Sequence, residues 1–95
     1  MTEELTKSQE LLIRRKNIVA NGVGIFNTAT VKDAKGAIII DADGRELIDF
    51  AGGIGVVNAG HCPEPVVAAI REQAGKYLHT SFNVVTYEPY IELCE

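Results

Sequence analysis

The sequence contains no tryptophan, and aromatic residues make up only 6% of the chain. It has only two cysteines, Cys62 and Cys94, whereas a disulfide framework would have more of them at closer spacing. We therefore expect reduced thiols and a cytoplasmic location. The continuous apolar runs, such as Ala37–Ile40, are only a few residues long. A membrane-spanning helix needs about 20 apolar residues, so we expect no membrane partner.

Positive charge is also scarce, with 9 Lys and Arg against 13 Asp and Glu and a net charge of −4. Proteins that bind nucleic acid neutralise phosphates with basic side chains. The basic run Arg14–Lys16 has no aromatic residues between its charges and is typical of a solvated helix face. We expect no nucleic-acid partner.

The hydrophobic fraction is 46%, and 95 residues can form one domain at most, or part of one. Local patterns predict an α+β fold. Thr6 and Gln9 form a capping box that begins a helix running to about Ala20. A β-hairpin is predicted over residues 37–50, with its turn at Asp43-Gly44, and a short strand at Thr30–Lys32.

A second helix is predicted over Val66–Ala74, following a proline-containing entry. Its apolar residues recur at helical spacing and predict a buried face; they are Val66, Ile70, Ala74 and Tyr77. Pro89 predicts the first turn of a third helix.

Between the hairpin and the second helix lies the glycine-rich segment Gly52–Gly55. Three glycines in four positions predict irregular backbone, either a plain turn or a close approach to a ligand or another chain. A phosphate cradle is disfavoured because the spacing fits neither the dinucleotide fingerprint nor the P-loop.

Other chemical groups have simpler interpretations. Adjacent ligands such as His61 and Cys62 rarely reach one metal ion, and neighbours in sequence rarely form a nucleophile–base pair. We expect no metal site, and we expect His61 to make a local backbone hydrogen bond. The hairpin also carries several carboxylates, which we interpret mainly as turn residues; they are Asp41, Asp43, Glu46 and Asp49.

The order of several motifs resembles the N-terminal part of class III pyridoxal-phosphate aminotransferases, especially the 4-aminobutyrate aminotransferase branch. The segments that carry the resemblance are Asp43–Val56, Asn58–His61, Val66–Ile70, His79–Phe82 and Tyr87–Glu95. The resemblance implies a fold-type I enzyme of which this chain is roughly the first quarter. Residues 1–86 would belong to the small domain, and residues 87–95 to the first helix of the large cofactor-binding domain.

The resemblance also implies a pyridoxal 5'-phosphate cofactor, amino acid and 2-oxo acid substrates, and a homodimer or higher oligomer. The family's Schiff-base lysine and its pyridine-nitrogen aspartate occur downstream, and no lysine here lies in a matching motif. We therefore expect no catalytic or cofactor-binding residue in this chain and no activity of the chain alone. Two positions match substrate-binding residues of the family, Ile54 beside the substrate's carbon chain and Asn83 near its carboxylate. Relatives usually carry Gly-His-X-His-Pro where this chain has Gly60–Pro65, so the helix entry departs from the family.

Two hypotheses from different classes follow. The first is the N-terminal portion of an ω-aminotransferase that transfers the amino group of 4-aminobutyrate, or of a related ω-amino acid, to 2-oxoglutarate; an acetylornithine or ornithine type is the alternative within the family. The second is a stand-alone, non-catalytic α+β module that self-associates through the glycine-rich loop and apolar helix. We also expect an exposed apolar patch and oligomerisation of the fragment, because surfaces that meet the large domain and the partner subunit would be left uncovered.

Overall fold

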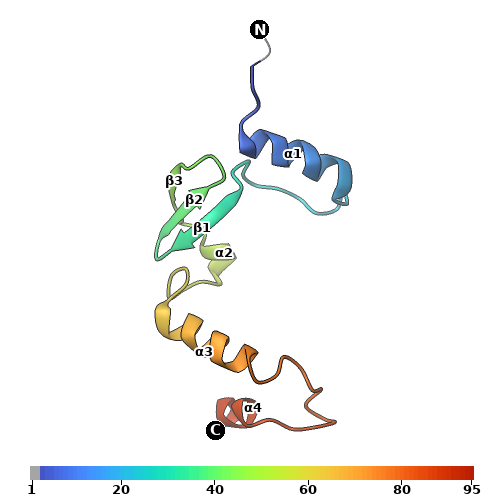
Figure 1. Ribbon diagram of the computed structural model, residues 1–95, viewed down its shortest axis with the longest axis vertical. Coiled ribbons are helices and arrows are strands. Elements are labelled where there is room, and N and C mark those ends of the chain that lie inside the picture. Colours follow the sequence, from blue (N-terminus) through green and yellow to red (C-terminus); the bar gives the residue numbers. More distant parts are fainter. Residues whose placement is uncertain (1–2) are drawn as a thin grey trace. The chain divides into compact units, whose positions relative to one another are not determined.

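The computed structural model describes residues 3–95 (Figure 1). The chain divides into two compact units between Pro63 and Glu64. The first unit holds one long helix and a small sheet, and the second holds two helices joined by turns. This combination of helices with an antiparallel sheet confirms the predicted α+β class.

Helix α1 (Lys7–Ile18) begins with the predicted capping box. The Gln9 amide donates to the Thr6 hydroxyl, and the Thr6 amide donates to the Gln9 side chain at 2.9 Å. The helix ends slightly earlier than predicted, because Val19 is already extended. The segment after the helix is held to it by Arg15, whose guanidinium donates to the carbonyl of Val23 at 2.7 Å.

Three antiparallel strands form the sheet, in the order β1-β2-β3. They are β1 (Val31–Lys35), β2 (Ile38–Asp41) and β3 (Glu46–Ile48). The predicted hairpin is therefore confirmed as β2 and β3, and the strand predicted at Thr30–Lys32 is longer than expected. Ile39 lies opposite Leu47, so two apolar side chains face each other across the hairpin.

The second unit contains α3 (Glu64–Ala74) and α4 (Glu88–Cys94). α3 begins two residues before the predicted start, and α4 has proline in its first turn as expected. The segment between them and the start of α4 share an aromatic cluster, in which the Phe82 ring lies 4.4 Å from that of Tyr90 and 5.1 Å from that of Tyr87, centroid to centroid. Both pairs meet edge to face, the arrangement that ring quadrupoles favour.

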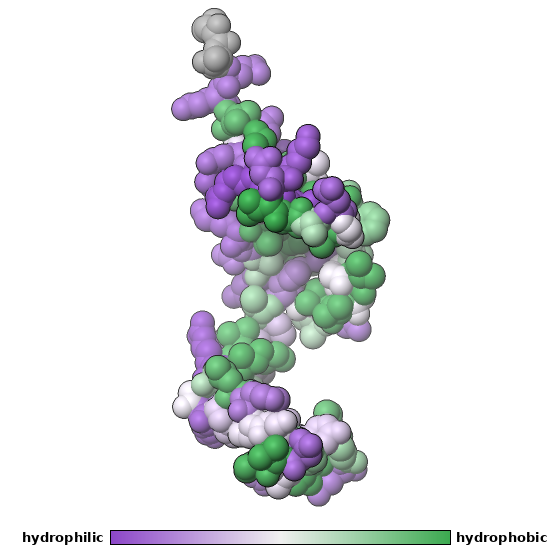
Figure 2. Space-filling view, turned by 90° about the vertical axis from the view of Figure 1, so that its right-hand side faces the viewer, coloured by the Kyte–Doolittle hydropathy of each residue, from purple (hydrophilic) through white to green (hydrophobic). Residues whose placement is uncertain are grey.

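No apolar side chain is fully buried among residues 3–95. The space-filling view accordingly shows hydrophobic residues at the surface (Figure 2). The expected exposed apolar surface is confirmed, whereas the predicted burial of one α3 face is wrong: Val66 is 50% exposed, Ile70 is 61% exposed and Ala74 is exposed, with only Tyr77 half-buried. Helical spacing marks a face that can be buried, but burial also requires a partner surface.

Among the described residues, no helix is both long enough and apolar enough to cross a membrane.

Candidate functional site: a left-handed turn fixed by a carboxylate

The glycine-rich segment forms a single left-handed turn, labelled α2 (Gly52–Gly55) in Figure 1. All four of its residues have positive φ, from 56° at Gly52 to 75° at Gly55. The amide of Gly55 donates to the carbonyl of Ala51 at 3.0 Å, which closes the turn. Only glycine adopts this backbone without cost, so the three glycines are explained by the handedness of the turn.

Ile54 is the exception, because it has φ 63° and ψ 54° inside this turn. A β-branched residue in the left-handed region is a genuine outlier, and the conformation costs about 1–2 kcal/mol. The side chain is 84% exposed, so no burial within the described chain offsets that cost. Strained residues of this kind persist where the surroundings hold them, commonly at functional sites.

The Asp49 carboxylate is what holds the entry to this turn. Its Oδ1 atom accepts hydrogen bonds from the amides of Ala51 at 3.0 Å and Gly52 at 2.9 Å. Its Oδ2 atom lies 2.6 Å from Nε2 of His61. The side chain is only 9% exposed. The Gly52 amide, and after it the His61 imidazole, hold the pKa of Asp49 below its usual value.

His61 is therefore a long-range partner, which corrects the expectation of a local hydrogen bond from its ring. An ionised carboxylate can only accept hydrogen bonds, so Nε2 of His61 carries the hydrogen. The backbone of the same residue pairs with Gly36, through N–H···O distances of 2.8 and 3.0 Å. His61 thus joins the β1–β2 turn to the carboxylate at the end of β3.

This Asp–His pair is the feature that sequence reasoning missed. One part of the arrangement could be predicted locally. Asp49 stands two and three residues before the amides that donate to it, which is the pattern of an Asx turn. The contact of His61 with Asp49 could not be predicted, because nothing in the local sequence brings position 61 back to position 49.

Asn83, the second predicted substrate residue, belongs to the second unit. It lies in a turn that begins at Ser81, whose carbonyl accepts from the amide of Val84 at 2.7 Å. Asn83 is exposed, and its side-chain carbonyl accepts from the Ser81 hydroxyl at 3.3 Å. An amide has two N–H donors in addition to its oxygen, and these suit a carboxylate.

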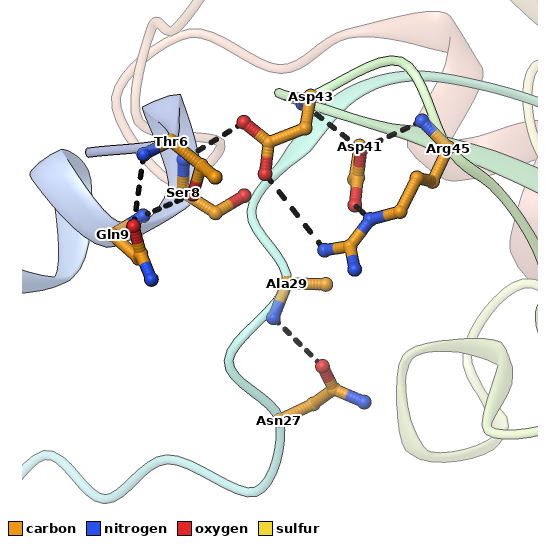
Figure 3. A network of polar contacts seen from close by, with 8 residues as sticks. All are labelled: Thr6, Ser8, Gln9, Asn27, Ala29, Asp41, Asp43 and Arg45. Carbon is orange, nitrogen blue, oxygen red and sulfur yellow. Dashed lines mark hydrogen bonds and ion pairs between the residues drawn. The ribbon is translucent and has the colours of Figure 1, made fainter. Parts of the chain in front are cut away.

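Asp41 and Asp43 have the structural contacts that their interpretation as turn residues predicts (Figure 3), whereas Glu46 lies in a strand and not in the turn. Asp41 is fully buried and accepts from the Arg45 amide and guanidinium, both at 2.8 Å. Asp43 accepts from the Ser8 amide at 3.2 Å, which ties the start of α1 to the hairpin turn. Glu46 is exposed on β3.

The described residues do not fit a pyridoxal-phosphate site. A Schiff-base lysine is activated by burial or by a neighbouring cation, whereas all five lysines here are exposed and two pair with glutamates. The glycine turn is no phosphate cradle either, because its first amide is already bonded to the Asp49 carboxylate, and a second anion there would be repelled.

Comparisons with known proteins are consistent across sequence and structure. The class-III aminotransferase family matches residues 18–95. A 5-aminovalerate aminotransferase of Pseudomonas putida is 52% identical over 88 residues, which are 93% of this chain and 21% of the relative. A 4-aminobutyrate aminotransferase of Escherichia coli is 44% identical over 91 residues, 96% of this chain and 21% of the relative.

Among solved structures, the ornithine δ-aminotransferase of Plasmodium falciparum aligns with a TM-score of 0.79 and 25% identity, over 93% of this chain and 22% of that one. The chain thus spans about a fifth of the length of the relatives that it matches. Both the sequence motifs and the arrangement of helices and strands are those of one family. The chain belongs to the class-III aminotransferases.

Proposed function

We propose that the chain is part of a pyridoxal-phosphate-dependent ω-aminotransferase, which moves the terminal amino group of a straight-chain ω-amino acid to 2-oxoglutarate. The observation that carries this proposal is the identity of 44–52% with relatives named for 4-aminobutyrate and 5-aminovalerate. Those two donors differ by one methylene, so both define the same substrate class. The ornithine type is a second candidate, supported by the likeness to a solved ornithine aminotransferase.

The cofactor would be held by residues outside this chain, since the residues present do not fit it. When bound, pyridoxal phosphate supplies an electron sink for the amino transfer. The 95 residues alone would therefore transfer no amino group. In the proposed enzyme, residues 1–86 belong to the small domain, residues 87–95 begin the large domain, and the enzyme is a homodimer or higher oligomer.

The role proposed for the α2 turn is to form part of the wall of the substrate pocket. Ile54 supplies an exposed aliphatic surface to the methylene groups of the donor. The left-handed turn suits this role, because the flanking glycines have no side chains to keep a ligand away from the backbone. Asn83 offers amide donors to the carboxylate of the substrate.

The test uses the complete gene product, meaning the polypeptide encoded by the whole reading frame that contains these 95 residues. We expect it to transfer amino groups from 4-aminobutyrate and 5-aminovalerate, and to use ornithine poorly. The isolated 95 residues should show no turnover and no cofactor absorbance band. Preference for ornithine would refute the donor assignment, and a reading frame of only 95 codons would favour the self-association module.

The pocket-wall role has its own test in the variant Ile54→Ala. Removing three carbons at about 0.8 kcal/mol per buried CH2 loses about 2.4 kcal/mol, which predicts a rise in KM for the donor of up to about 50-fold. Ile18→Ala is the matched control, because Ile18 is similarly exposed, at 79%, but lies at the end of α1. Equal effects of the two substitutions would contradict a substrate contact at Ile54.

A further inference from the structure

Among the described residues, the Asp49 side chain makes the hydrogen bonds that hold the α2 turn to the end of β3. Its Oδ1 atom accepts hydrogen bonds from the Ala51 and Gly52 amides, and its Oδ2 atom accepts one from the His61 ring. His61 is in turn fixed by its backbone bridge to Gly36. Asp49 therefore holds the α2 turn through its Oδ1 atom and is itself linked through Oδ2 and His61 to the β1–β2 turn, all within the first unit.

We propose that Asp49 and His61 are positioning residues, which hold the left-handed turn in the one conformation that presents Ile54 to the donor. This inference rests on the proposed function. The exposed fraction of the His61 side chain is 20% and that of Asp49 is 9%, so neither offers the broad contact surface that Ile54 does. Their part is to act on the turn.

The need for such a device follows from the strain at Ile54. A β-branched residue leaves the left-handed region unless its neighbours prevent it. Removing the Asp49 carboxylate would leave the Ala51 and Gly52 amides without their acceptor and the His61 ring without its partner. The turn would then sample other conformations, and Ile54 would move with it.

The consequence is selectivity for the length of the donor. Straight-chain ω-amino acids differ only in their number of methylenes. One methylene in an apolar pocket changes the specificity constant kcat/KM about 10–200-fold. A pocket wall that moves by about 1 Å can therefore accept a neighbouring chain length. Asp49 and His61 would set the ratio of kcat/KM for 4-aminobutyrate to that for 5-aminovalerate.

The test compares three variants of the complete gene product. In Asp49→Ala all three contacts of the carboxylate are lost. In Asp49→Asn the amide oxygen still accepts from Ala51 and Gly52, and the NH2 group can donate to His61 once its ring changes tautomer. Asp33→Asn is the matched control, because Asp33 is exposed on β1 and, within residues 3–95, accepts only from its neighbour Ala34, at 2.8 Å.

For Asp49→Ala we expect a KM for the donor about tenfold higher, kcat within about twofold, and a severalfold change in the 4-aminobutyrate to 5-aminovalerate ratio. Asp49→Asn should stay within about threefold of the parent in KM, and Asp33→Asn should not differ from it. A merely structural role would lower the amount of folded enzyme without changing the chain-length ratio. An active parent whose Asp49→Ala variant keeps both KM and ratio would overturn the inference and leave the proposed function standing.

Amide hydrogen exchange tests whether Asp49 holds the α2 turn, and this measurement does not depend on enzymatic activity. In Asp49→Ala, the peptide covering residues 50–57 should exchange faster, whereas a peptide from α1 should be unchanged. Unaltered exchange over residues 50–57 would overturn the inference even if the gene product proved inactive toward ω-amino acids.

Discussion

One added methyl group at Gly60 should weaken the bridge between Gly36 and His61. Gly60 has φ +85°, and a Cβ atom there would lie 3.2 Å from both Cα and O of Gly36. These are backbone atoms that cannot turn aside as a side chain would. Gly44 is the matched control, because its φ is +84° and no atom lies within 4 Å of the corresponding Cβ position. The substitutions Gly60→Ala and Gly44→Ala therefore impose the same backbone strain and differ in the contact.

The expected losses of stability follow from the backbone strain at positive φ and from the contact with Gly36. Left-handed backbone costs a non-glycine residue about 1–2 kcal/mol, so Gly44→Ala should destabilise the hairpin by that amount. Gly60→Ala should add about 1 kcal/mol for each of the two bridge hydrogen bonds that it weakens, for a total of about 3–4 kcal/mol.

The assay is amide hydrogen exchange of the complete gene product, in which the exchange rate of a protected amide reports its opening free energy. Gly60→Ala should speed exchange of the Gly36 and His61 amides about 100-fold or more. Gly44→Ala should affect only the hairpin turn. Equal exchange at the bridge in both variants would show that the Gly36 contact does not stabilise it, and the reasoning would be wrong.

Two further predictions concern acid and association. Hydrogen bonds from the Arg45 backbone and guanidinium hold the pKa of Asp41 below its usual value, so the charged form stabilises the fold; that contribution is complete above about pH 4 and is lost as the pH falls through the lowered pKa. The stability difference between the parent and Asp41→Asn, measured by urea unfolding, should therefore shrink below pH 4, and a constant difference would refute the assignment. The isolated 95 residues, with no buried apolar side chain among those described, should self-associate; sedimentation equilibrium giving a monomer at high concentration would contradict this.

The sequence predicted the local elements well because their signals are local. The capping box at Thr6 and the turn at Asp43-Gly44 are each made by residues no more than four positions apart in the sequence. Both are present in the structure. The pairing of Asp49 with His61 was not predictable in the same way, because it joins positions 12 apart across an irregular segment. Burial of the α3 face was mispredicted for a related reason, since periodicity does not reveal whether a partner surface exists.

The conformation of the candidate site and the stability of the chain have different physical origins. Directional hydrogen bonds to Asp41 and Asp49 fix the two loops that follow β2 and β3, and both carboxylates are almost inaccessible to solvent. Such bonds determine geometry but contribute modest net free energy, because water offers competing partners. Burial of apolar surface supplies most of the free energy of folding, and here that surface is exposed. Substitutions at Asp49 should therefore change which donor the site selects, whereas substitutions on the exposed apolar face of α3 should change how the chain associates.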